Sequence, residues 1–170
     1  MRTEFDGSPA WFQWALHDIG IKERPGRGST ARILEYRTLA QIPLKGDDSD
    51  VPWCAIFVNA ALESCGIKGS RSGMARSFIH SKQFVRLEKA SIGAITVFSS
   101  PRGPSTGHVG FYRGEGAKVI YVLGGNQGDK VSIAPFTKAR LLGHFWPASL
   151  PLPVTGPIKF DAGGSTPSDK

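Results

Sequence analysis

The segment that most restricts the fold is the apolar run that begins at Cys54. Apolar residues recur at i, i+4, i+7, i+8 and i+11 from this cysteine, while Ile56, Phe57 and Ala60 cover the opposite side. A helix that is apolar on nearly every side is buried within a domain. Glycine commonly ends helices. The pattern therefore predicts a buried helix that starts near Cys54 and ends at Gly66.

Helices are predicted before this segment and strands after it. Helical spacing of apolar residues indicates helices over residues 9–20 and 29–39, and a short helix within residues 74–84. From Ile92 the apolar period changes to two, which is typical of strands. Strands are predicted over residues 92–98, 108–112, 118–123, 130–133 and 141–146. Helices followed by a meandering, antiparallel sheet favour the α+β class.

The length and the composition together indicate one domain. A chain of 170 residues fits a single core. After Pro147 the composition shifts to Pro, Gly, Ser and Thr, as in linkers. We expect a single domain over residues 1–147, a tail or linker over residues 148–170, and a monomer.

The charge balance is basic, with 21 Lys and Arg against 14 Asp and Glu. Such a surface attracts polyanions, including bacterial wall polymers. The basic residues are scattered and accompany no nucleic-acid motif, so we expect no nucleic-acid function. No segment approaches the roughly 18 apolar residues that a membrane-spanning helix needs. Residues 1–6 lack the apolar core of a signal peptide, which predicts synthesis in the cytoplasm.

The two cysteines are expected to stay unpaired. Cys54 and Cys65 are 11 residues apart, which on one helix is about 16 Å of rise. A disulfide needs Cα atoms within about 7 Å of each other. No CxxC pair is present, so we expect neither a structural zinc site nor any other metal or cofactor.

Of the two cysteines, Cys54 has the helix position that favours a nucleophile. Pro52 is tolerated in a first helical turn, and Ser49 or Asp50 can cap it, so Cys54 is predicted to lie where the helix dipole favours a thiolate. Cys65 lies near the other end, where the dipole disfavours a thiolate. The alternative for Cys54 is an inert, buried thiol.

His108 is the candidate base. Its neighbours Gly107 and Gly110 allow a second element to approach the ring closely. As an imidazolium, His108 would also stabilise a thiolate at Cys54. The other three histidines have no such setting and are interpreted as ordinary surface or core residues; they are His17, His80 and His144.

Asn126 is the first candidate to orient His108. It follows Gly124 and Gly125 at a predicted strand end, and its side-chain amide could accept a hydrogen bond from the ring N–H. Asp129 is a second candidate, and a turn residue in a left-handed conformation is the alternative reading of Asn126. Trp53 and Gln127 are candidate substrate-binding residues, with core packing as the alternative for Trp53.

Three blocks carry a family resemblance: Pro52-Trp53-Cys54-Ala55, Gly107-His108-Val109-Gly110 and Gly124-Gly125-Asn126-Gln127. Together they resemble the CHAP amidohydrolase/peptidase group of the papain-like NlpC superfamily, in particular its phage- and prophage-associated branch. The resemblance implies a papain-like fold with the nucleophile at the start of a buried helix. It also implies Cys54 as nucleophile, His108 as base and Asn126 as orienting residue. Many relatives carry a carboxylate or a second histidine at the third position.

The activity implied is that of a cysteine amidase or endopeptidase, which cleaves amide bonds of the peptidoglycan stem peptide or cross-bridge through a thioester. Two biological settings are open: an endolysin released through a holin, or a secreted antibacterial effector with an immunity protein as partner. Both would act on the cell wall. The alternatives are an acyltransferase that uses the same thioester, and a wall-binding or virion structural module without turnover.

Overall fold

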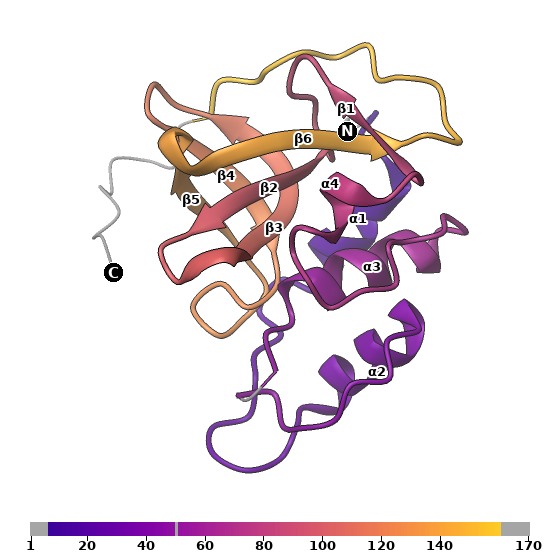
Figure 1. Ribbon diagram of the computed structural model, residues 1–170, viewed down its shortest axis with the longest axis vertical. Coiled ribbons are helices and arrows are strands. Elements are labelled where there is room, and N and C mark those ends of the chain that lie inside the picture. The colour runs from indigo at the N-terminus through magenta and orange to yellow at the C-terminus, as the bar shows by residue number, and fades with distance from the viewer. Residues whose placement is uncertain (1–6, 50, 161–170) are drawn as a thin grey trace.

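The computed structural model describes residues 7–49 and 51–160 of the chain, with helices in the first half and strands in the second (Figure 1). Residues 1–6, Asp50 and residues 161–170 lie outside the described part. The prediction about a signal peptide, which concerns residues 1–6, and the proposed helix cap Asp50 therefore also lie outside it. The helices are α1 (Ala10–His17), α2 (Ala31–Ala40), α3 (Cys54–Ser64) and α4 (Ser77–His80). The strands are β1 (Phe84–Leu87), β2 (Ile95–Ser100), β3 (Gly103–Glu115), β4 (Val119–Gly124), β5 (Ser132–Thr137) and β6 (Leu141–Pro147).

The six strands form one sheet in the order β1-β6-β2-β3-β4-β5, and every neighbouring pair is antiparallel. Helices pack on this sheet, which confirms the α+β class. Strands β2 to β5 follow one another as the predicted meander. β6 instead returns across the sheet and pairs with both β1 and β2.

Three parts of the sheet differ from the sequence prediction. β3 spans Gly103–Glu115 and so extends beyond the predicted residues 108–112 at both ends. β1 was not predicted, because a four-residue edge strand with only Phe84 fully buried has no clear period. Its pairing with β6 holds it in the sheet. β5 starts at Ser132 instead of residue 130, because Lys130 and Val131 bond to residues 20–22 and not to β4.

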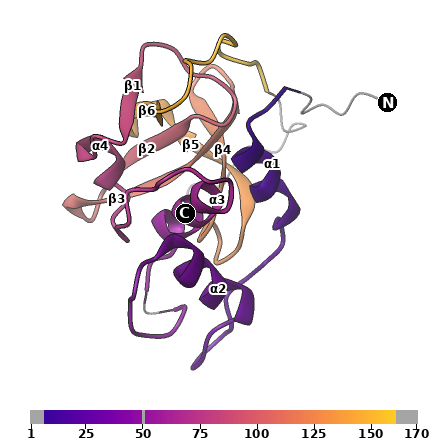
Figure 2. The same cartoon turned by 90° about the vertical axis from the view of Figure 1, so that its right-hand side faces the viewer.

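Helix α3 is the centre of the core. All residues from Cys54 to Leu62 are buried, as the apolar pattern predicts. The helix contacts α1 and α2 as well as β3 and β4, and Figures 1 and 2 show it between α2 and the sheet. It ends at Ser64, followed by Cys65 and by Gly66 with φ +76°.

The start of α3 differs in one detail from the prediction. Cys54 is the first helical residue, and Trp53 is the N-cap, without a side-chain capping bond. The Ser49 hydroxyl donates to the Gly26 carbonyl at 3.5 Å and does not cap the helix. Trp53 fixes the helix start instead through packing, with its ring stacked on Tyr36 at 6.2 Å.

The chain after β6 runs back along the sheet and contacts it (Figure 1). The Ile158 N–H donates to the Tyr112 hydroxyl at 3.1 Å, and the backbone groups of Glu115 bond to Ile158 and Phe160. The Arg113 guanidinium lies 4.2 Å from the centre of the Phe160 ring. The first part of the predicted tail therefore packs on the domain, up to residue 160.

Candidate active site

Cys54 and His108 line the same cleft, which has a volume of about 820 Å³. Cys54 comes from the start of α3 and His108 from β3. The cleft is also lined by the turn after β4, which contains Asn126 and Gln127, and by β5 with Phe136. The fold thus brings together four positions that the sequence separates by up to 82 residues.

Cys54 lines this cleft, yet the residue is only 6% exposed. Burial raises the pKa of the thiol, and the backbone N–H groups of Val109, Ala55 and Cys54 itself oppose that change. The N–H groups at the helix start lower the pKa, as expected, but desolvation outweighs them and the net change is upward. These N–H groups remain available to stabilise negative charge at the same place.

His108 forms a hydrogen bond with Gln127, and this pair is the main polar contact of the cleft. The distance from His108 Nε2 to Gln127 Oε1 is 2.8 Å. The Gln127 Nε2 group donates to the Val122 carbonyl at 3.2 Å and to the Ser132 carbonyl at 2.8 Å. Since both of these partners are acceptors, the amide oxygen faces the ring.

This arrangement sets the tautomer of His108. The amide oxygen of Gln127 can only accept, so Nε2 of the neutral ring carries the proton and Nδ1 is left with a lone pair. A ring held this way can accept a proton through Nδ1. That is the property required of a general base.

The surroundings of His108 keep it neutral. Its ring stacks on Phe136 at 4.5 Å with an interplanar angle of 16°. Burial lowers the pKa of His108 to about 4, the positive charge of Arg140 acts in the same direction, and the bond to Gln127 acts against both. Both pKa shifts favour a thiol and a neutral imidazole over a thiolate–imidazolium pair.

Asn126 and Asp129 do not orient His108 in this structure. Asn126 has φ +57° and Asp129 has φ +61°, which are left-handed turn conformations that these residue types tolerate. The alternative reading of Asn126 as a turn residue describes its geometry. The residue that contacts the ring is Gln127, the next residue along the chain, for which the sequence indicates only a substrate-binding role.

The two glycines before Asn126 explain how Gln127 reaches the ring. A Cβ atom on Gly124 would collide with the Gln127 side-chain oxygen, so the absence of a side chain leaves room for the amide. A Cβ atom on Gly125 would lie 2.7 Å from the Trp53 ring. The turn can therefore sit directly against the start of α3. In the sequence, the signal for the orienting role of Gln127 is a side-chain amide that follows two glycines and a turn residue.

The close approach at Gly125 gives a testable prediction. Gly125→Ala is expected to destabilise the fold by about 1–3 kcal/mol, because the new methyl group overlaps the rings of Trp53 and neighbouring Phe57. Gly116→Ala is the matched control, since its Cβ would meet only Val119 at an ordinary 3.6 Å. Urea unfolding of both variants measures the difference. Equal stability of the two variants would contradict the close contact.

Trp53 does not line the cleft. Its side chain is fully buried, and its indole N–H donates to Glu23 Oε2 at 3.0 Å. The core-packing alternative therefore describes Trp53, and the substrate-binding interpretation is wrong for this structure. Tryptophan supports both readings in a sequence, because its large ring packs equally well in cores and in binding sites.

The remaining cysteine and histidines lie outside the cleft. Cys54 and Cys65 are both free. His144 is a buried sheet residue, with Nδ1 2.8 Å from the Thr96 hydroxyl and a pKa lowered to about 4, mainly by burial. His17 ends α1 and His80 ends α4.

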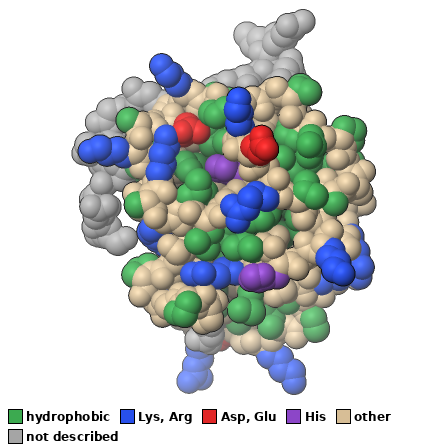
Figure 3. Space-filling model, turned by 45° about the horizontal axis from the view of Figure 1, so that its top comes forward, with side chains coloured by type: hydrophobic (Ala, Val, Ile, Leu, Met, Phe, Trp, Pro, Cys, Tyr) green, Lys and Arg blue, Asp and Glu red, His purple; other side chains and the backbone are tan. Residues whose placement is uncertain are grey.

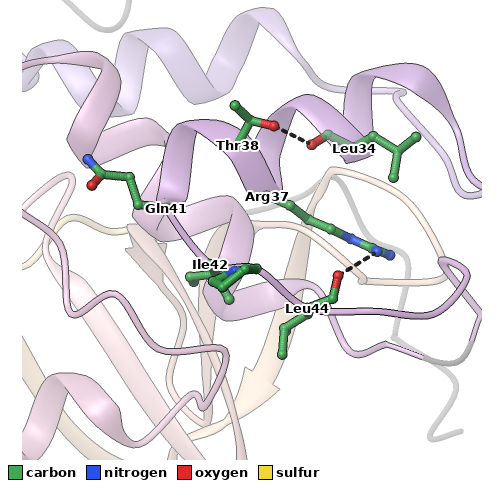
Figure 4. A pocket seen from close by; sticks show the side chains of 7 residues that line it. Leu34, Arg37, Thr38, Gln41, Ile42 and Leu44 are labelled. Atoms are coloured by element: carbon green, nitrogen blue, oxygen red, sulfur yellow. Dashed lines mark hydrogen bonds between the residues drawn. The ribbon is translucent and has the colours of Figure 1, made fainter.

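A second hollow, of about 540 Å³, lies beside α2 and carries none of these groups (Figure 4). Arg37 is its only charged lining residue among those described, and its guanidinium donates to the Gly46 carbonyl at 2.8 Å. It also lies 3.7 Å from Asp48. Arg37 thus ties the loop after α2 to the helix. The lining residues are Leu34, Arg37, Thr38, Gln41, Ile42, Pro43 and Leu44.

The surface charge is dispersed. Figure 3 shows Lys and Arg side chains spread among apolar ones over the face that it draws. Within residues 7–49 and 51–160, no cluster of three or more His, Cys, Asp or Glu side chains could hold a metal ion. No helix in that part of the chain is long and apolar enough to cross a membrane.

The comparisons with known proteins return no match. No family model, no curated protein and no solved structure is significantly similar to this chain.

Proposed function

We propose that the protein is a cysteine hydrolase that cleaves amide bonds in peptidoglycan peptides. The observation that carries this proposal is the shared cleft of Cys54 and His108, in which Gln127 leaves the base with an unprotonated Nδ1. A thiol at a helix start, a neutral imidazole and an orienting amide together suit acyl transfer to sulfur.

The reaction would proceed in two halves. Nδ1 of His108 takes the thiol proton as Sγ of Cys54 attacks the amide carbonyl, and the N–H groups at the start of α3 stabilise the oxyanion. The C–N bond then breaks, and His108 gives its proton to the leaving amine. In the second half, water loses a proton to His108 and attacks the thioester, which releases the carboxylate and restores the thiol.

The neutral state of the pair favours proton transfer during the attack over a preformed thiolate. Burial raises the pKa of Cys54 and lowers that of His108, so both changes act against an ion pair in the free protein. Desolvation of the cleft also strengthens the stabilisation of the oxyanion by N–H groups.

The choice of peptidoglycan rests on the resemblance of the three sequence blocks and on the charge of +7. A basic protein is retained on an anionic wall polymer, and that attraction weakens with salt. The deciding experiment is a digest of purified peptidoglycan with the native protein and with Cys54→Ala, followed by mass spectrometry of the products. New amine and carboxyl termini with the native protein alone are expected. Their absence would refute the proposal.

Gln127 is expected to act as a positioning residue. Gln127→Ala should lower kcat about 10- to 100-fold with little change in KM, because the ring loses its orientation and tautomer while the cleft remains. Asn126→Gly is the matched control, since glycine adopts the positive φ of that position freely. Steady-state kinetics on a soluble stem peptide measures both. An equal loss of kcat in Asn126→Gly would contradict the assignment to Gln127 and favour Asn126 as the orienting residue.

A further inference from the structure

Two arginines, Arg102 and Arg140, line the Cys54 cleft. Arg102 is exposed at the tip of the hairpin between β2 and β3, where Ser100 pairs with Gly103. Arg140 lies in the short turn before β6. Both line the cleft together with His108.

The Arg140 side chain is fixed in place by hydrogen bonds to the end of β2. Its Nε and Nη2 groups donate to the Ser99 carbonyl at 2.8 and 2.6 Å. Ser99 lies at the end of β2, just before the hairpin that carries Arg102. The backbone N–H of Arg102 donates to the Ser100 hydroxyl at 3.2 Å. The hairpin backbone is therefore anchored, while the Arg102 side chain makes no hydrogen bond to any described residue.

The positive charge in the cleft is not compensated by described residues. None of the described lining residues is Asp or Glu, and neither arginine forms an ion pair with a carboxylate in the described part of the chain. The charge of Arg140 also reaches His108, where it contributes to the lowered pKa. A substrate that brings a negative group into this cleft would supply the missing partner.

We propose that the cleft selects peptides with a free carboxylate near the scissile amide, and that Arg102 binds this carboxylate while Arg140 adds positive charge from the wall. This inference rests on the proposed function, because it names the substrate class of the same site. A guanidinium binds a carboxylate through two parallel hydrogen bonds. The Arg102 side chain can form such a pair because it is exposed and has no other partner.

Binding to the inactive Cys54→Ala protein tests the inference without turnover. The probes are the stem-peptide fragment Ala-γ-D-Glu-Lys with free carboxylates and the same fragment with amidated carboxylates, compared by calorimetry at low salt. We expect about tenfold tighter binding of the free acid. Adding Arg102→Gln should abolish this preference. Adding Lys68→Gln, which removes an exposed charge outside the cleft, should preserve it.

Three results would overturn the inference: equal affinity for both fragments, a preference that survives Arg102→Gln, or no binding of either fragment at millimolar concentration. The peptidoglycan digest with the native protein is read separately. A carboxylate preference without new termini would support the binding site and refute the hydrolase. New termini without a preference would refute the binding site and leave the hydrolase standing.

Discussion

Cys54→Ala is expected to lower amide hydrolysis by at least about 10³-fold, because the reaction then lacks the atom that forms the thioester. The cleft should remain intact, since only one sulfur atom is removed from a residue that is 6% exposed. Cys65→Ala is the matched control. Cys65 follows the last residue of α3, and it does not line the cleft, so its replacement should leave turnover within about twofold.

The measurement combines kinetics with trapping of the intermediate. Rapid quenching of the native protein with a stem-peptide substrate should reveal a mass increase on Cys54 equal to the acyl group. Thermal unfolding of both variants establishes that they are folded. Residual activity of Cys54→Ala near the native level, or acylation at another residue, would rule out the proposed nucleophile.

Acid is expected to destabilise the protein strongly between pH 6.5 and about 4. Burial lowers the pKa of both His108 and His144 from 6.5 to about 4. In this window the unfolded chain binds protons that the folded protein excludes. The contribution of the two histidines to the free energy of unfolding is therefore fully present above pH 6.5 and is lost as the pH falls towards 4. Each histidine contributes on the order of 3 kcal/mol, with a slope of about 1.4 kcal/mol per pH unit.

Urea unfolding at a series of pH values measures this slope. His144→Gln should reduce the slope by about half, because one of the two buried histidines is removed. His80→Gln, at an exposed position, controls for the loss of a histidine as such. Glu115 acts in a separate range: its lowered pKa gives stability that is lost only as the pH falls below the ordinary range of a carboxyl group. An unchanged slope in His144→Gln would contradict the prediction.

Local patterns were sufficient for the elements that carry the site. The apolar spacing after Cys54 depends only on neighbouring residues, and it predicts a buried helix that starts near this residue, as α3 does. The change of period at Ile92 likewise predicts the meander from β2 to β5. The glycines around His108 predicted close packing, and a Cβ atom on Gly110 would lie 3.1 Å from the Leu123 carbonyl of β4.

Long-range contacts decided the parts that the patterns missed. β1 exists because it pairs with β6, a strand that lies 54 or more residues later in the chain. The Pro-rich segment after Pro147 contains no periodic pattern, yet it bonds to the backbone of Glu115 near the end of β3. Neither pairing has a signal in the residues nearby, because the partner groups come from distant parts of the chain.

By itself, the sequence determined the α+β class and the position of Cys54 at the start of a buried helix, since periodicity and helix ends are local properties. Only the tertiary structure decided which amide reaches His108. Asn126 and Gln127 are adjacent, and the left-handed turn at Asn126 together with the space at Gly124 directs the Gln127 side chain to the ring. The tertiary structure also decided the protonation of Cys54 and His108, because desolvation depends on the whole surrounding fold.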